Sequence, residues 1–199
     1  MSDPDLEALM ARYGAGDDEA FDALYPRISG RMYAFCLRLT RRRGEADDLF
    51  QETFLKLHRS RATYQPRAAA LHWVFAIVRS VHLDRLRSRR RRPEAVVETD
   101  EGLATFTSLE DAEGSPEDLA RAKQLMTVVD RVLRELPESQ RAAYVLIREE
   151  GLSVADAAAV LGGTATAVKL RAFRAYEAIR AALLAAGIAD DVQARGGSR

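Results

Sequence analysis

Cysteine is almost absent from this chain, since Cys36 is the single one among 199 residues. A disulfide within the chain is therefore excluded, and a structural zinc site has no CxxC pair to build on. The three histidines, His58, His72 and His82, do not share a metal-ligand spacing such as HExxH. We therefore expect no metal site, and we expect Cys36, which lies within YAFCLRL, to be a small core residue.

Long apolar runs are also missing. No stretch approaches the roughly 18–20 residues that a membrane span needs, and the start, MSDPDLEALM, is acidic where a signal peptide is basic. We therefore expect a cytoplasmic protein. The sequence contains no P-loop, no Ser/His/Asp set with a supporting motif and no clustered carboxylate metal site. These absences argue against an enzyme, and nothing in the sequence indicates a cofactor.

The charges balance, with 30 basic and 30 acidic residues, but they are segregated along the chain. Residues 31–92 carry a net charge of plus 11 and residues 119–199 plus 3, whereas residues 1–30 carry minus 5 and residues 93–118 minus 9. Aromatic residues are interleaved with the cations of the most basic segment. This combination is the electrostatic footprint of nucleic-acid binding.

The acidic segment 93–118, PEAVVETDEGLATFTSLEDAEGSPED, is the predicted linker. It contains no Lys or Arg, and it lacks a sustained period of 3.6 or 2, so it buries too little apolar surface to fold alone. We therefore predict two small helical domains, residues 1–92 and 119–186, joined by an acidic flexible linker. A disordered tail is expected over residues 187–199.

Helical periodicity dominates both sides of the linker, and no alternating strand pattern competes with it. The fold class is therefore predicted to be all-α. The first domain is expected to contain helices near residues 18–42, with a kink or break at Pro26, near 45–60 and near 70–90. Several more helices follow Ser115, which is the predicted N-cap of a helix with Pro116 at its first position.

The helix DDLFQETFLKLH has an unusual outward face. At 100° per residue its inward side gathers Leu49, Phe50, Thr53, Phe54 and Leu57, and its outward side gathers Asp48, Gln51, Glu52 and Leu55. Asp48 and Glu52 are a like-charge pair at i, i+4, which costs an isolated helix about 0.2–0.5 kcal/mol. A binding partner explains this face, and a solvated face with one stray leucine is the alternative.

The C-terminal half contains a helix-turn-helix pattern. Ser153 and Asp156 form the start signal of a short helix that ends before Gly162, and Thr164 caps a longer one, ATAVKLRAFRAYEAIRAALL. Such a second helix enters the major groove in DNA-binding proteins, although plain helical hairpins share the pattern. Its inward face is predicted to hold Val168, Ala172, Ala175 and Ile179, and its outward face Lys169, Leu170, Phe173 and Arg174.

Both halves together resemble a bacterial sigma factor of the extracytoplasmic-function (ECF) group. EADDLFQETFLKLH is similar to the core-polymerase-binding segment of the family, and LHWVFAIVRSVHLDRLRSRRRR is similar to its promoter-melting and −10-reading segment. LRELPESQRAAYVLIREEGLSVADAAAVLGGTATAVKLRAFRAYEAIR resembles its −35-binding domain. The resemblance implies a factor that directs core RNA polymerase to promoters, contacts the clamp helices of the largest subunit, and is restrained by an anti-sigma factor, often membrane-bound.

The resemblance also assigns site residues. The polymerase-binding residues are expected to be Asp48, Gln51, Glu52 and Leu55. The −10 element is expected to meet Arg61, Tyr64, Arg67, Arg79, Arg85 and Arg87, the first three of which belong to the loop that takes up an unstacked base. The −35 element is expected to meet Thr164, Thr166, Lys169, Arg171 and Arg174.

Some positions depart from the pattern of the family or have a second interpretation. Ser80 stands where an asparagine is common, and Leu170 and Phe173 replace residues that are usually polar. The apolar pair can touch thymine methyl groups or an anti-sigma helix, and we favour the second. Trp73 shares a helix face with Ile77 and Val81, which favours core packing over base stacking. A conventional helix-turn-helix regulator remains the alternative function, but it leaves the melting-like segment unexplained.

Overall fold

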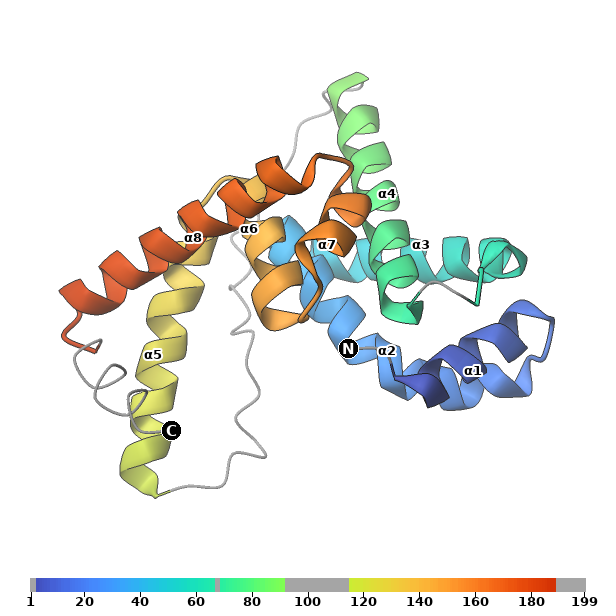
Figure 1. The fold of residues 1–199 in the computed structure, drawn as a ribbon, viewed down its shortest axis with the longest axis horizontal. Helices are drawn as coiled ribbons and strands as arrows, with labels where there is room; N and C mark the ends of the chain where they lie inside the picture. The colour runs from blue at the N-terminus through green and yellow to red at the C-terminus, as the bar shows by residue number, and fades with distance from the viewer. Residues whose placement is uncertain (1–2, 67–68, 92–114, 189–199) are drawn as a thin grey trace.

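The computed structural model describes residues 3–66, 69–91 and 115–188 (Figure 1). Within these ranges every regular element is a helix and no strand occurs, which confirms the predicted all-α class. The elements follow in the order α1 (Pro4–Gly14), α2 (Glu19–Thr40), α3 (Arg43–Ser60), the 3-10 helix η1 (Arg61–Thr63), α4 (Ala70–Arg91), α5 (Pro116–Glu135), α6 (Glu138–Tyr144), the π-helical turn η2 (Val145–Glu149), α7 (Val154–Leu161) and α8 (Ala165–Ala185).

The N-terminal domain, residues 3–91, is organised around α2, which packs against α1, α3 and α4. Phe35 of α2 meets Phe75 of α4 edge to face, with 5.2 Å between the ring centroids. Cys36 lies beside them in the core and is fully buried, as predicted. Burial raises the pKa of the Cys36 thiol to about 12, so it stays protonated and unreactive. Helices α3 and α4 begin and end within two residues of their predicted limits.

Helix α1 was not predicted from the sequence. It begins with two strong signals, because the Asp3 side chain accepts hydrogen bonds from the backbone of the first turn and Pro4 follows at the first helical position. Leu6, Met10 and Tyr13 then recur at helical spacing, and all three are buried. These start signals and this spacing would have identified the helix.

A kink or a break was expected at Pro26, and the structure shows that α2 does not break there. It runs without interruption from Glu19 to Thr40 with Pro26 inside it. Proline removes the hydrogen bond to the carbonyl of Asp22, but Asp22 and Pro26 both lie on the exposed side of the helix, so the carbonyl is not left in the apolar core. Buried Leu24 and Ile28 flank the proline and hold the helix against the core.

The C-terminal domain, residues 115–188, starts as predicted, since Ser115 caps α5 by accepting a hydrogen bond from the Asp118 N–H. Residues 116–118, counted in the predicted linker, are therefore helical. Helices α5 and α6 both pack on α8. Residues 187 and 188, counted in the predicted tail, belong to this domain, because Ile188 is buried and its N–H donates a hydrogen bond to the carbonyl of Leu183. The rest of the predicted tail lies outside the described residues.

The two domains pack directly against each other, which the sequence did not indicate. Helix α7 contacts α4 and α6 contacts α2, and Figure 1 shows α7 between α8 and α4. One continuous core of buried residues contains Val74 and Val78 of α4 together with Leu146, Leu161 and Val168 of the C-terminal domain. The described part of the chain therefore forms one closed body.

Candidate nucleic-acid interface

The outward face of α3 is exposed, as its periodicity predicted. Asp48, Gln51, Glu52 and Leu55 all lie at the surface, and the Leu55 side chain is 57% exposed. The opposite side of the helix enters the core, with buried residues Ala46, Leu49, Thr53 and Leu57. The face therefore offers two carboxylates, an amide and a large apolar side chain to a partner.

The two acids of this face share a partner that sequence reasoning missed. Arg85 of α4 places its Nη2 3.2 Å from Asp48 Oδ2 and its Nη1 3.8 Å from Glu52 Oε1. This cation relieves the repulsion between the two carboxylates. A residue predicted to bind DNA is thus held against the residues predicted to bind polymerase.

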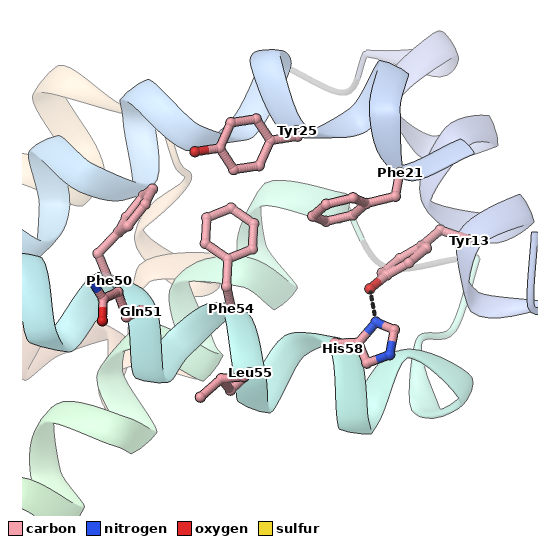
Figure 2. Close-up of a pocket in the computed structure, with 8 residues that line it drawn as sticks. All are labelled: Tyr13, Phe21, Tyr25, Phe50, Gln51, Phe54, Leu55 and His58. Atoms are coloured by element: carbon pink, nitrogen blue, oxygen red, sulfur yellow. Dashed lines mark hydrogen bonds between the residues drawn. The ribbon is translucent and has the colours of Figure 1, made fainter. Parts of the chain in front are cut away.

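An open apolar groove adjoins this face. It lies between α2 and α3 and reaches α1, and Figure 2 shows its aromatic rings facing one another across it. The ring of Tyr25 packs against the ring of Phe54 in a tilted arrangement, with 5.1 Å between the centroids, although Tyr25 is 42% exposed. The groove is continuous with the outward face of α3, because Gln51 and Leu55 line both. Its lining residues are Tyr13, Phe21, Tyr25, Phe50, Gln51, Phe54, Leu55 and His58.

The segment predicted to take up a −10 base follows α3. Its Arg61 is partly buried, with Nη2 3.4 Å from Asp18 Oδ1. Tyr64 is only 7% exposed, so in this state its ring offers no face for stacking on a base. Instead it packs edge to face on Trp73, at 5.5 Å between centroids, and its hydroxyl donates to Glu7 Oε2 at 2.6 Å. Trp73 packs against the core, as favoured from the sequence, whereas Arg67 lies outside the described residues.

The cations of α4 divide between the surface and the contact with the C-terminal domain. Arg87 is exposed and pairs with Asp84 one turn earlier. Arg79 is instead directed to Glu138 of α6, with Nη1 2.5 Å from Oε1, and His82 Nε2 lies 3.0 Å from the other oxygen. The hydrogen bond with His82 and the charge of Arg79 hold the pKa of Glu138 at about 2, against the effect of burial. Arg79, predicted to bind DNA, therefore joins the two domains in this state.

The helix-turn-helix has the predicted local structure. Ser153 and Thr164 accept hydrogen bonds from the N–H groups of Asp156 and Ala167, and Gly162 ends α7 with a φ of 67°. That left-handed backbone is the conformation that glycine adopts without strain.

The faces of α8 also match the prediction. Val168, Ala175 and Ile179 are buried and Ala172 is partly buried. Thr166, Lys169, Leu170, Phe173 and Arg174 are exposed, whereas Arg171 is partly buried. The exposed cations stand in the first three turns of the helix, where they are free to approach a duplex.

A second set of polar contacts between the domains was also missed. Arg38, a buried residue of α2, places Nη1 2.6 Å from Asp130 Oδ1 and Nη2 3.1 Å from Glu149 Oε1. Arg31 lies 2.7 Å from Glu150. Burial raises the pKa of Glu149 and of Glu150, which the neighbouring arginines partly oppose.

Two sequence-based expectations of absence concern metals and membranes. In residues 3–66, 69–91 and 115–188, no group of three or more His, Cys, Asp or Glu side chains has an arrangement that could hold a metal ion. Within the same described part of the chain, no helix combines the length and the apolar character that crossing a bilayer requires.

Comparison with known families accounts for both domains. A family model described as Sigma-70 region 2 matches residues 24–92, and one described as Sigma-70, region 4 matches residues 127–179. The two matches therefore define a two-region helical transcription initiation factor of the sigma-70 type.

Two relatives show to which group within this class the chain belongs. The chain is 34% identical over 167 residues to the ECF RNA polymerase sigma factor SigM of Mycobacterium tuberculosis, covering 84% of this chain and 79% of that protein. It is 32% identical over 180 residues to the RNA polymerase sigma-H factor of Pseudomonas aeruginosa, covering 89% and 93%. The chain belongs to the family of ECF RNA polymerase sigma factors, which direct core RNA polymerase to promoters.

Solved structures share the fold. The sigma factor RpoE in complex with the anti-sigma factor NepR from Bartonella quintana has a TM-score of 0.62 at 23% identity, over 82% of this chain and 96% of that chain. CnrH in complex with the cytosolic domain of CnrY has a TM-score of 0.60 at 23% identity, over 92% and 99%. A conventional helix-turn-helix regulator, the alternative considered from the sequence, does not account for the region 2 match.

Proposed function

We propose that the outward face of α3 docks on core RNA polymerase, that the segment from η1 to α4 reads the melted −10 element, and that the start of α8 reads the −35 element. The observation that carries this assignment is the exposure of two surfaces of opposite charge. An acidic and apolar face stands on α3, and cations stand on the first turns of α8. One suits a protein partner and the other a polyanion.

The docking face fits the clamp helices of the polymerase largest subunit. Exposed Leu55 supplies apolar area beside the two acids, and the carboxylates supply charge that selects a basic partner. Arg85 shields Asp48 and Glu52 in the free protein, so a basic polymerase helix competes with Arg85 for the same carboxylates.

The −10 element is read by the segment from η1 to α4 of the N-terminal domain. Arg61 and Arg87 remain at or near the surface, where they meet phosphates. Arg79 and Arg85 are held by Glu138 and by the acids of α3, so their contact with DNA requires the exchange of those partners. Docking and opening of the domains would release these cations at the promoter.

The −35 element is read by α8. Thr164, Thr166, Lys169, Arg171 and Arg174 all stand in its cap and first three turns, as a recognition helix requires. An arginine placed bidentate on guanine discriminates against other bases by about 1–3 kcal/mol. Exposed Arg174 is the side chain best placed for such a contact.

An anti-sigma factor is the proposed regulator. One similar structure is of the sigma factor RpoE bound to the anti-sigma factor NepR. This chain exposes two large apolar side chains on the recognition helix, Leu170 at 48% and Phe173 at 57%. Such an exposed pair is best covered while the protein is away from DNA. We assign Leu170 and Phe173 to the anti-sigma contact.

Transcription in vitro tests the assignment. Core polymerase with this protein is expected to initiate at the promoter of its own operon, and Arg174→Ala is expected to lose the dependence of transcription on the −35 element. Arg180→Ala is the matched control, because Arg180 is an exposed arginine further along the same helix. Equal losses with Arg174→Ala and Arg180→Ala would contradict the assignment of the recognition helix.

The apolar pair is tested in the same assay. Leu170→Ser/Phe173→Ser is expected to retain transcription and to escape inhibition by the anti-sigma factor. If this variant loses promoter activity but is inhibited normally, the pair reads DNA and the anti-sigma assignment is wrong.

A further inference from the structure

Helix α1 precedes the segment matched by the region 2 family model, which begins at residue 24. It is nevertheless an integral part of the N-terminal domain, since Leu6, Met10 and Tyr13 are buried in the core. It contacts η1 and α4 as well as α2. These contacts fix the position of α1 relative to the segment between η1 and α4.

Glu7 of α1 joins the two ends of that segment. Its Oε2 accepts a hydrogen bond from the Tyr64 hydroxyl at 2.6 Å and another from the backbone N–H of Ala70 at 2.7 Å. Tyr64 directly follows η1, and Ala70 is the first residue of α4. One carboxylate oxygen therefore fixes the separation between the start and the end of the connecting loop.

Each of these two hydrogen bonds is energetically favourable. The N–H of the first residue of a helix has no intrahelical partner, and a negative charge at a helix N-terminus is favoured by the helix dipole. Burial and the bond to Glu7 raise the pKa of Tyr64, so the phenol stays protonated and donates. Packing on Trp73 holds the Tyr64 ring in place.

The far end of α1 makes a second set of contacts with the same segment. A Cβ placed on Gly14 would lie 3.0 Å from the Arg61 carbonyl oxygen, so glycine permits a close approach of α1 to η1. The Tyr13 hydroxyl is 2.7 Å from His58 Nδ1, and the Arg61 guanidinium lies over the Tyr13 ring at 5.4 Å. Helix α1 thus fixes the turn before the loop as well as its two ends.

We propose that α1 is the positioning element of the −10-reading loop and that Glu7 is its positioning residue. By fixing Tyr64 relative to Ala70, the carboxylate sets the positions of the two ends of the loop before DNA arrives. Ends that are already fixed lose less conformational entropy when the loop takes up an unstacked base. The inference rests on the proposed function of this loop and adds a residue that never touches the base.

The test measures base preference rather than total activity. Holoenzyme is reconstituted with the full-length protein and transcribes a pool of promoters with a fixed −35 element, a randomised −10 element and a barcode in the transcribed region. We expect the wild type to enrich one base at the captured position. Glu7→Ala is expected to reduce that enrichment roughly tenfold, because two charge-assisted hydrogen bonds are lost.

Three further variants separate positioning from a general loss of stability. Glu7→Gln keeps an acceptor oxygen and is expected to restore most of the preference, whereas Tyr64→Phe, which retains the ring, is expected to lose part of it. Asp5→Ala is the matched control, because Asp5 is an exposed acid on the same helix. Its preference is expected to equal that of the wild type.

The outcomes are distinguishable. Glu7→Ala and Tyr64→Phe holoenzymes that transcribe less but select the same base as the wild type would overturn the positioning role. If Glu7→Ala fails to fold, as circular dichroism would show, Tyr64→Phe decides alone, because it removes only one hydroxyl. A wild type that selects no base anywhere in the −10 element would refute the proposed function of the loop instead.

Discussion

At the scale of single residues, Arg141 shows most clearly what holds the closed state. It is 2% exposed, and its guanidinium donates to the carbonyls of Leu133, Leu136 and Leu39 at 3.2, 2.8 and 3.3 Å, and also to the carbonyl of Arg38. Two of these carbonyls belong to the last turn of α5 and the residue that follows it, and two to the last turn of α2. One arginine therefore satisfies helix ends from both domains.

Arg141→Ala is expected to reduce the free energy of unfolding by roughly 3–5 kcal/mol, because it leaves several buried carbonyls without a donor. Arg141→Lys is expected to recover only part of this loss, since an ammonium group lacks the planar fork that reaches all four oxygens. Urea denaturation followed by circular dichroism measures both values. A loss below about 1 kcal/mol for the alanine variant would contradict this account.

Glu138 makes the stability depend on acid pH. Its pKa in the folded protein, about 2, lies below the ordinary glutamate value of about 4.3, chiefly because of the hydrogen bond with His82. The stabilisation by the carboxylate is therefore complete above about pH 4.3 and is lost as the pH falls toward 2. The ion pair between Arg79 and Glu138 adds to this stabilisation.

Glu138→Gln is expected to lower the stability at pH 7 by roughly 1 kcal/mol, since solvent screens this partly exposed group. The gap between the wild type and the variant should then close between pH 4.3 and 2. Urea midpoints measured across this range test the prediction. A gap that stays constant over the range would show that Glu138 does not titrate as described.

At the scale of secondary structure, local signals predicted the elements well. The caps at Ser115, Ser153 and Thr164 and the left-handed Gly162 all lie where the sequence placed them, because each forms bonds only with its nearest neighbours in the chain. Of the kink or break expected at Pro26, the break does not occur, because the packing of α2 on the core outweighs the cost of one missing hydrogen bond.

The outward and inward faces of α3 and α8 were also predictable, since periodicity alone decides them. The partners of the candidate site residues were not. Arg79, Arg85 and Tyr64 read as surface or DNA-facing side chains in the sequence, yet they bind Glu138, Asp48 and Glu7. Each of these contacts joins residues more than 30 positions apart, and no local pattern encodes such a pairing.

The docking face of α3 gives a prediction at this scale. Leu55→Asp is expected to weaken binding to core polymerase roughly tenfold or more, because a buried unpaired carboxylate replaces an apolar contact. The fold should not change, since Leu55 is 57% exposed. Leu184→Asp is the matched control, because Leu184 is 51% exposed at the far end of α8. Pull-down measures how much core enzyme each variant retains. Equal retention by the two variants would contradict docking through α3.

At the scale of the whole molecule, the closed arrangement conflicts with the proposed reading of both promoter elements. Positions −10 and −35 differ by about 25 base pairs, which is about 85 Å along the duplex at 3.4 Å per base pair. In the closed state α8 follows directly after α7, which packs on α4, and α8 itself is only about 30 Å long. With the proposed assignment of the two reading surfaces, we expect the domains to separate before both surfaces meet their elements together.

The chain has the length for such a separation. The 23 residues from 92 to 114 reach about 80 Å when fully extended. Opening must break the ion pairs that Arg38 and Arg79 form with the C-terminal domain and the hydrogen bonds that Arg141 donates to the carbonyls of α2. The charged groups that are freed can then bind water, polymerase or DNA. We expect core polymerase to supply the binding energy that shifts the equilibrium, which requires that it bind the open state better than the closed one.

Energy transfer between two dyes tests this opening. Asp5→Cys on α1 and Leu184→Cys on α8 place both labels on exposed positions outside the proposed contacts, and buried Cys36 stays unlabelled because the pKa of its thiol is raised to about 12. We expect high transfer in the free protein and a marked loss on binding core polymerase. Asp130→Asn, which weakens the buried pair with Arg38, should lower transfer already in the free protein. Equal transfer in the free and polymerase-bound wild type would mean that the domains stay packed, and that the chain reads only one promoter element at a time.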